Sequence, residues 1–326
     1  MTVATPLRVS RGDAVVAQLP GAGAPTPFQS AGWCRAWIAE AAAAEGAAPL
    51  LLRAATAAGR PVYAGLQVHS EPAGKVLRPL CWPWADYHRA WWPEGEPEPE
   101  GAAAALAAAL AELQRIEGAA LDLQDVAEGD LLHRAALLAG ARSSPASPVV
   151  AFDLTDAERV AAVLGRKETV RKARLLARRG RVELIHWRDP ADLRERLPVF
   201  FAMHAAQWRD RPDVVAPFDG GPVDRTFAAA AQRGDCGVVL SELRLESVPL
   251  AMYYGFLHQD RYWAYRTAFD QEYRRLSPGY QLVAGMIRDF VAAGVTCFDL
   301  MRGDYPYKAD YAEGVSHNVR LERAKP

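Results

Sequence analysis

The sequence has few cysteines and no pattern that would gather them around a metal. The four cysteines are Cys34, Cys81, Cys236 and Cys297, without a Cys-x-x-Cys pair or a histidine at ligand spacing. Each lies in a largely apolar stretch, where free cysteine packs as a small hydrophobic side chain. We therefore expect no zinc site and no metal cofactor.

Long apolar runs and an excess of one charge are also missing. No run of 18 apolar residues occurs, so we expect no transmembrane helix. The first residues carry no basic segment followed by an apolar core, so we expect no signal peptide. The formal net charge is −1, so any site for a polyanion must be local. These features predict a cytoplasmic protein without a membrane partner, and they leave the oligomeric state open.

What is present is a chain long enough for two domains. Half of its 326 residues are hydrophobic. In the C-terminal half, segments 237–245, 248–257 and 261–269 are separated by short turns, which predicts an antiparallel meander. An apolar stripe predicts a helix over 278–293, and residues 295–301 predict a strand parallel to the third one.

The remaining predicted elements complete an α/β domain with a mixed, α+β type sheet. They are a strand over 182–187, helices over 191–208 and 222–232, and a last strand over 318–322 that closes the domain. The resulting order is β-α-α-β-β-β-α-β-β.

The N-terminal half repeats this plan in a weaker form. Its predicted elements are a helix over 30–44, strands over 49–54, 61–68 and 75–82, a helix over 102–116 and a strand over 119–125. We interpret the chain as a tandem duplication. Residues 1–155 form a degenerate copy, 156–181 a basic linker helix, and 182–326 the working copy.

The basic linker carries eight arginines and lysines but only one acid, Glu168, between residues 166 and 181. Four of them share one helical stripe: Lys167, Arg171, Arg174 and Arg178. Such a segment is suited to the 3′-phosphate of coenzyme A or to tRNA phosphates. A solvated helix between domains is the third interpretation.

The junction between the strand ending at Phe269 and the following helix is the strongest local signal. Ser277 is a suitable N-cap and Pro278 a suitable first helical residue. The free N–H groups of such a helix end attract an anion such as diphosphate, and Gly279 permits close approach. A well-capped helix without a ligand is the alternative. The expected phosphate contacts are Arg274, Arg275, Ser277, Gly279 and Tyr280.

Arg274-x-x-Ser277-x-Gly279 resembles the Gln/Arg-x-x-Gly-x-Gly/Ala motif of GNAT acetyltransferases, with serine in place of the first glycine. The wider stretches Tyr265–Asp270, Phe298–Asp304 and Leu80–Tyr87 resemble the FemAB/CelD type, in which two GNAT folds are fused. The resemblance spans nearly the whole chain and is most specific over 250–308. It implies one phosphate turn, in the second copy, and acyl transfer to an amine from acyl-CoA or, in the FemAB branch, from aminoacyl-tRNA.

Residues after the strand 295–301 are expected at the cleft, because ligand sites of open sheets lie beyond strand carboxyl ends. Asp304 is a candidate to take a proton from the attacking ammonium, and Tyr307 a candidate to protonate a leaving thiolate. Arg302 and Lys308 are candidate substrate ligands, Lys308 for a carboxylate or phosphate. A tight glycine turn with a surface ion pair is the alternative.

His204 and Trp208 lie one turn apart on a predicted helix. His204 is either a base or ligand at the acceptor site or a packing residue. Trp208 and Tyr265 complete the candidate substrate contacts. Asp299 is expected to be a buried carboxylate paired with an arginine or a backbone amide.

The sequence thus predicts an N-acyltransferase that uses acyl-CoA, in the first place acetyl-CoA. The acceptor is a small-molecule, saccharide or peptide amine, and N–H groups near Phe269 stabilise the oxyanion. Two alternatives stay open. One is an aminoacyl-tRNA-dependent transferase. The other is a non-catalytic GNAT-fold protein in polysaccharide biosynthesis, because Ser277 narrows the turn.

Overall fold

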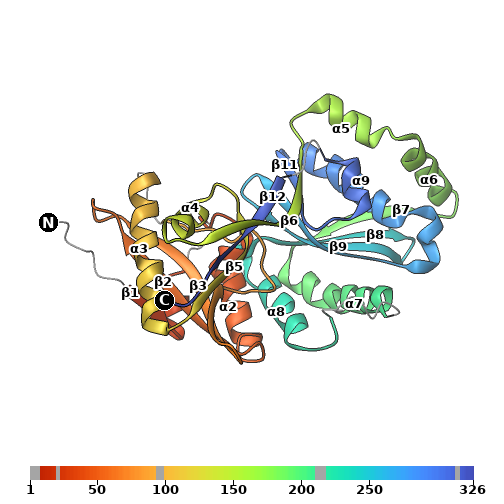
Figure 1. Ribbon diagram of the computed structural model, residues 1–326. Coiled ribbons are helices and arrows are strands. Elements are labelled where there is room, and N and C mark those ends of the chain that lie inside the picture. The colour runs from red at the N-terminus through yellow and green to blue at the C-terminus, as the bar shows by residue number, and fades with distance from the viewer. Residues whose placement is uncertain (1–7, 20–22, 93–98, 210–217, 313–315) are drawn as a thin grey trace. The chain divides into compact units, whose positions relative to one another are not determined.

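The computed structural model contains two compact α/β units (Figure 1). It describes residues 8–19, 23–92, 99–209, 218–312 and 316–326. The first unit is Met1–Val149 with Ser316–Pro326, and the second is Val150–Val315. Among the described residues, no helix is long and apolar enough to cross a membrane. Within the same ranges, no cluster of three or more metal-ligating side chains occurs.

The first unit holds a mixed sheet with strand order β1-β2-β3-β4-β5-β12-β6. Its elements are β1 (Arg8–Arg11), α1 (Asp13–Val16), η1 (Pro27–Gln29), α2 (Ala31–Glu40), β2 (Ala47–Ala55), β3 (Pro61–Glu71), β4 (Gly74–Pro79), α3 (Pro99–Glu117), β5 (Ala120–Ala127), α4 (Leu131–Leu138), β6 (Arg142–Asp153) and β12 (Ser316–Arg323). Among the described strands of this unit, only β4 and β5 pair in parallel, and α3 follows β4 and precedes β5. The predicted meander and crossover of this half are therefore present.

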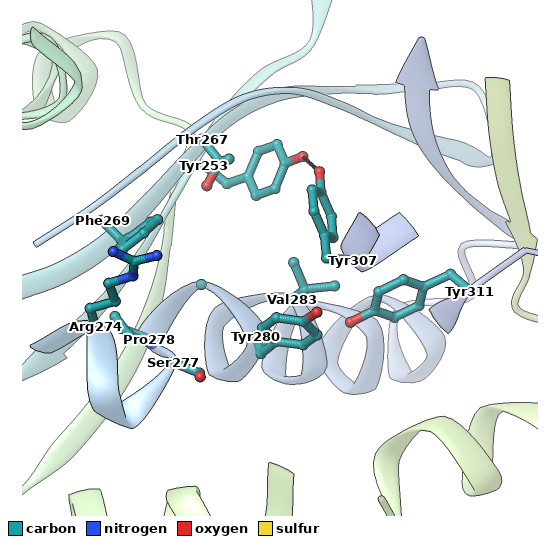
Figure 2. Close-up of a pocket in the computed structure, with 11 residues that line it drawn as sticks. Tyr253, Thr267, Phe269, Arg274, Ser277, Pro278, Tyr280, Val283, Tyr307 and Tyr311 are labelled. Atoms are coloured by element: carbon teal, nitrogen blue, oxygen red, sulfur yellow. Dashed lines mark hydrogen bonds between the residues drawn. The ribbon is translucent and has the colours of Figure 1, made fainter. Parts of the chain in front are cut away.

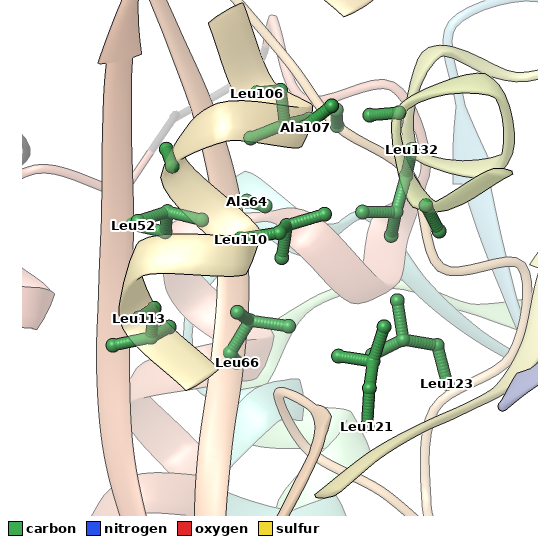
Figure 3. Packing of buried hydrophobic residues seen from close by; sticks show 14 of the residues in the cluster. Leu52, Ala64, Leu66, Leu106, Ala107, Leu110, Leu113, Leu121, Leu123 and Leu132 are labelled. Atoms are coloured by element: carbon green, nitrogen blue, oxygen red, sulfur yellow. The ribbon is translucent and has the colours of Figure 1, made fainter. Parts of the chain in front are cut away.

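The core of the first unit lies between α3 and one face of the sheet (Figure 3). Leu106, Leu110 and Leu113 are fully buried on α3 and pack toward Leu52 and Leu66 of the sheet. The many alanines of α3 favour the helix and keep its surface flat. The alanine-rich helix α3 thus forms a closely packed layer on the sheet of the first unit.

Residues that follow β4 are buried beside β5. His88 forms a parallel bridge with Val126, where β4 has already ended. Trp91 forms an antiparallel bridge with Tyr63 of β3, and the two rings stack with centroids 6.0 Å apart. The segment after β4 therefore fills the space beside β5 that a longer β4 would occupy.

The second unit holds strands in the order β6-β11-β10-β9-β8-β7, of which β6 contributes its last residues. Its further elements are α5 (Ala157–Leu164), α6 (Lys167–Ala177), β7 (Val182–Trp187), α7 (Pro190–Trp208), α8 (Pro222–Ala231), η2 (Gly234–Cys236), β8 (Val238–Leu245), β9 (Val248–His258), β10 (Arg261–Phe269), η3 (Gln271–Leu276), α9 (Pro278–Ala292), β11 (Cys297–Arg302) and η4 (Pro306–Asp310). Helix α9 covers one face, with α5 and α6 against it, and α7 and α8 cover the other (Figure 1).

The second half follows its sequence pattern closely. The antiparallel meander β8-β9-β10 and the parallel pairing of β10 with β11 are confirmed. The predicted last strand is present as β12, but it does not close the second unit. β12 pairs with β5 and β6 in the first unit, because alternate residues Val319 and Leu321 complete that core.

The basic segment also differs from the single predicted linker helix. It forms two helices, α5 and α6, separated at Gly165 and Arg166, and both belong to the second unit. The proposed limits of the two copies, 1–155 and 182–326, stay a prediction.

Candidate active site

Strands β10 and β11 separate soon after they begin. They pair only from Arg261–Trp263 to Cys297–Asp299, whereas β10 stays on β9 as far as Phe269, with a bulge after Ala264. In the open part, the Phe269 N–H donates to Gln207 Oε1 at 2.9 Å. This donor, which the sequence favoured for the oxyanion, is thus occupied. Strand alternation places the Thr267 N–H on the same side of β10, away from β9.

A cavity of about 280 Å³ opens beside the separated strands (Figure 2). It is lined by Tyr253, Thr267, Phe269, Arg274, Ser277, Pro278, Gly279, Tyr280, Val283, Tyr307 and Tyr311. Among these described residues Arg274 carries the only charge. Aromatic and aliphatic walls of this kind suit an uncharged, largely apolar group.

The turn before α9 forms the rim of this cavity. Ser277 stands at the N-cap in the left-handed conformation, with φ of 50°, and Pro278 is the first helical residue. The Ser277 side chain does not cap the helix; its Oγ accepts a hydrogen bond from Lys172 Nζ at 2.7 Å. A Cβ atom on Gly279 would meet only Phe269 Cδ1, at 4.0 Å. The protein itself therefore leaves the space above Gly279 open.

A second, polar cavity of about 420 Å³ shares Ser277 and Tyr280 with the first. It is lined by Arg166, Glu168, Thr169, Lys172, Ser277, Tyr280, Gln281 and Asp310. Helix α6 is fixed over α9 because Gln281 Nε2 donates to the Thr169 carbonyl at 3.0 Å. The cavity thus joins the N-terminus of α9 to cations from the basic segment.

Both cations of the polar cavity have acidic partners. Lys172 Nζ lies 3.2 Å from Glu168, and Arg166 Nη1 lies 2.8 Å from Asp310. Hydrogen bonds from Arg171 and Lys172 lower the pKa of Glu168 to about 2, so this exposed carboxylate is ionised near neutral pH. An entering anion would compete with these carboxylates for the two cations.

Two tyrosine hydroxyls meet at the inner side of the apolar cavity (Figure 2). The hydroxyl oxygens of Tyr253 and Tyr307 are 3.5 Å apart. Burial raises the pKa of both phenols. Both hydroxyls are therefore protonated near neutral pH, and either can donate.

The end of β11 is held by two buried charges. Asp299, 1% exposed, accepts from Arg261 Nη1 at 2.9 Å and from the Met301 N–H at 2.8 Å. This confirms the structural interpretation of Asp299. Lys308 Nζ donates to the carbonyls of Met301 and Arg302 at 2.9 and 2.6 Å. These bonds stabilise the turn after β11 and occupy the Lys308 ammonium. The role of Lys308 as a substrate ligand stays a prediction.

The structure gathers part of the predicted site. Arg274, Ser277, Gly279, Tyr280 and Tyr307 all line the apolar cavity. Arg275 and Asp304 are exposed and Arg302 is half-buried, and none of these three is among its lining residues. Their proposed roles stay predictions.

The remaining candidates lie on the face of the sheet that α7 and α8 cover. Tyr265 stacks on Phe227 with centroids 5.5 Å apart. His204 is buried on α7 against Phe218. Burial, helped by the charge of Arg266, lowers the pKa of His204 to about 3. Such an imidazole is a weak base at neutral pH, which favours the packing interpretation. Trp208, half-buried on the same helix, keeps its predicted role as a proposal.

Sequence reasoning missed Tyr253 and the direct contact between Lys172 and the turn. Strand alternation could have placed Tyr253 and Thr267 on one face of the meander, but not beside Tyr307, which comes 54 residues after Tyr253. The sequence offered the basic segment as a candidate for binding phosphate, among other interpretations. Of the eight basic residues in that segment, Lys172 is the one that contacts Ser277, and this contact depends on how α6 packs on α9.

Comparison with known proteins identifies the second unit. Residues 164–309 match the acetyltransferase (GNAT) domain family. The second unit therefore contains a domain of the GNAT superfamily. The predicted α/β fold and GNAT family are confirmed, and acyl transfer in general is the chemistry that the matched domain supports. No curated protein sequence matches the chain.

Solved structures with the same fold cover most of this GNAT chain. FemX is 14% identical, with a TM-score of 0.61 over 95% of this chain and 94% of its own. The C-terminal domain of a protein described as a lysylphosphatidylglycerol synthetase from Agrobacterium fabrum is 14% identical, with a TM-score of 0.54 over 83% and 82%. L-PGS from Bacillus licheniformis is 11% identical, with a TM-score of 0.53 over 85% and 83%. At these identities the likeness concerns the fold alone.

Proposed function

We propose that this GNAT protein is an N-acyltransferase that takes its acyl group from acyl-CoA, with acetyl-CoA as the first candidate donor. The observation that carries the proposal is the pair of adjacent cavities, which share Ser277 and Tyr280 in their walls. Coenzyme A has a diphosphate head, a neutral arm and a terminal thioester. The polar cavity offers Arg166, Lys172 and the N-terminus of α9 to the diphosphate. The apolar cavity offers an uncharged channel of matching chemistry to the arm and thioester.

The apolar cavity has no acidic side chain among its described lining residues, which favours an uncharged acyl group over an aminoacyl group. An aminoacyl group carries an α-ammonium, which needs a carboxylate or several carbonyl oxygens once it leaves water. None of the described residues that line this cavity is acidic. An acetyl or other uncharged acyl group has no such requirement.

The proposed reaction is direct attack of an amine on the thioester carbonyl. The N–C bond forms, the C–S bond breaks, and Tyr307 gives its hydroxyl proton to the departing sulfur. The Thr267 N–H is our candidate donor to the oxyanion. Asp304, in the turn after β11, stays the candidate acceptor of the proton that the amine loses. The acceptor is an amine on a small molecule, saccharide or peptide.

Calorimetric titration tests the donor. We expect acetyl-CoA to bind the wild type, and Lys172→Met to weaken binding roughly tenfold or more, because a charge-assisted bond to phosphate is lost. Lys167→Met, an exposed residue on the same helix, is the matched control and should bind as the wild type does. No heat with acetyl-CoA or longer acyl-CoA at any accessible concentration would reject the proposal.

One observation favours a second candidate, transfer from aminoacyl-tRNA. The outer side of α6 forms a groove of about 490 Å³ lined by Gly165, Lys167, Val170, Arg171, Arg174, Leu175 and Arg178, without an acid among these described residues. Binding of charged tRNA should then weaken steeply with salt. Neutralising Arg171, Lys172 and Arg174 together should abolish it. A flat salt response would eliminate this candidate.

A further inference from the structure

Tyr253 places a hydroxyl where a phenylalanine would fill the same space. It lies on β9, 3% exposed, and packs in the core beneath α9. A buried hydroxyl destabilises the fold unless it forms hydrogen bonds. Its hydroxyl reaches the inner side of the apolar cavity and faces Tyr307 (Figure 2). The hydroxyl of Tyr253 therefore calls for a role beyond packing.

The Tyr253 hydroxyl has two acceptors within reach, and both are distant. The Ala264 carbonyl oxygen and the Tyr307 hydroxyl oxygen each lie 3.5 Å away. Hydrogen bonds of this length are weak. The hydroxyl is thus held near Tyr307 without a strong bond, and it can strengthen its bond to whichever acceptor gains negative charge.

Either hydroxyl can donate in this pair, and the directions of the two pKa shifts favour Tyr253 as the donor. Hydrogen bonding to Tyr307 adds to the burial that raises the pKa of Tyr253. The bond from Tyr253 acts in the opposite direction on Tyr307 and offsets part of the rise in pKa that burial causes there. Tyr253 is the partner that keeps its proton, and Tyr307 is the more readily ionised of the two.

We propose that Tyr253 is a positioning residue for Tyr307 in the transfer reaction. When Tyr307 gives its proton to the thiolate sulfur, the Tyr253 O–H donates to the phenolate oxygen left behind. The proton that the amine loses, passed on through solvent, restores Tyr307, so protons balance over one turnover. This role rests on the proposed acyl-CoA reaction, and it adds to that reaction a residue that acts through Tyr307.

Kinetics of three variants test the role. We expect Tyr307→Phe to lower kcat by about a hundredfold, the usual contribution of a general acid. Tyr253→Phe should lower kcat on the order of tenfold, with the KM for acyl-CoA nearly unchanged, because one bond to a developing charge is lost. The double variant should match Tyr307→Phe, since Tyr253 acts only through Tyr307. Additive losses, or full activity of Tyr253→Phe, would overturn the proposal.

Tyr254→Phe is the matched control. Tyr254 is the next residue on β9, faces the opposite side, and donates to the Phe227 carbonyl at 3.1 Å. Removing its hydroxyl should cost about 1 kcal/mol of stability and leave kcat unchanged. A merely structural role of Tyr253 would give the same result as this control.

A direct titration separates this proposal from the choice of donor. In protein with ¹³C-labelled tyrosine rings, the Tyr307 signal should titrate at higher pH in Tyr253→Phe than in the wild type, because its phenolate loses a donor. This readout needs no substrate. An unchanged titration of Tyr307 would reject the role of Tyr253 even if acyl-CoA is the donor. A shifted titration without acyl-CoA turnover would support the pairing and reject only the donor.

Discussion

The two units contain the same meander and crossover, but the segment that follows the third strand fills the adjacent space in one unit and leaves it open in the other. In the second unit, residues 270–277 link β10 to α9, and the separated strands leave a cavity lined by aromatic side chains. In the first unit, residues 80–98 link β4 to α3, and His88 and Trp91 pair with the strands beside the gap. The segment after the third strand thus fills the space beside the strands in the first unit and leaves a cavity open in the second.

The difference has an energetic consequence. Trp91 is 5% exposed and joins β3 by two backbone hydrogen bonds, so the first unit gains buried apolar area from its junction. The second unit forgoes this gain where its cavity lies. Such a trade is expected where a site must stay open for a ligand.

Truncating Trp91, which fills the space beside β3 in the first unit, should produce the largest loss of stability. Trp91→Ala removes a buried ring stacked on Tyr63 and should lower the free energy of unfolding by about 3–5 kcal/mol. Urea denaturation of the variant measures this loss. Binding of acetyl-CoA below the transition should be unchanged. A loss under 1 kcal/mol would mean that the junction is not what stabilises the first unit.

Acid should weaken the second unit through a buried histidine. The folded-state pKa of His204 is about 3, below the value near 6.5 of the unfolded chain. A depressed pKa contributes stability above pH 6.5, and this contribution is lost as the pH falls from 6.5 toward 3. The loss should reach about 2 kcal/mol at pH 5. Denaturation at pH 7 and pH 5 measures it, and His204→Phe should remove most of that difference.

His69 is the buried histidine of the first unit whose pKa can be compared with that of His204 in the second. Burial, with the charge of Arg78, lowers its pKa in the first unit as burial and Arg266 lower that of His204 in the second. The pKa of His204 falls as far as about 3, so we expect the acid response of the chain to follow His204 first. A pH response that persists in His204→Phe would assign it to His69 or other groups.

Sequence reasoning recovered the second unit and much of the turn because local signals agree there. Alternation, the apolar stripe of α9 and Pro278 at its first position each determine a local conformation. It failed at β12, since a short alternating strand suits either sheet. It also failed at Tyr253 and Lys172, whose partners Tyr307 and Ser277 lie 54 and 105 residues away. Such contacts depend on tertiary packing, which no local pattern encodes.

Two glycines of α9 offer a test of the open space in the second unit. Gly279→Ala places a methyl group in the cavity, where the nearest atom outside its own helix turn is Phe269 Cδ1 at 4.0 Å, and should raise the Kd for acetyl-CoA roughly tenfold by blocking close approach. Gly285→Ala is the control, because its Cβ would lie 2.7 Å from Leu184 Cδ2. It should lower stability and leave binding intact. Stable Gly279→Ala protein that binds normally would place the donor elsewhere.

The smallest effect concerns Ser277, where the turn departs from the family motif. Its left-handed backbone disfavours any side chain, whereas its hydroxyl gains the bond from Lys172. Ser277→Gly relieves the backbone and loses the bond, so its stability should stay close to that of the wild type. Ser277→Ala loses the bond and keeps the strain, and it should be about 1 kcal/mol less stable than Ser277→Gly. Thermal unfolding of the two variants measures this difference. Equal stabilities would mean that a Cβ atom at this left-handed position causes no measurable backbone strain.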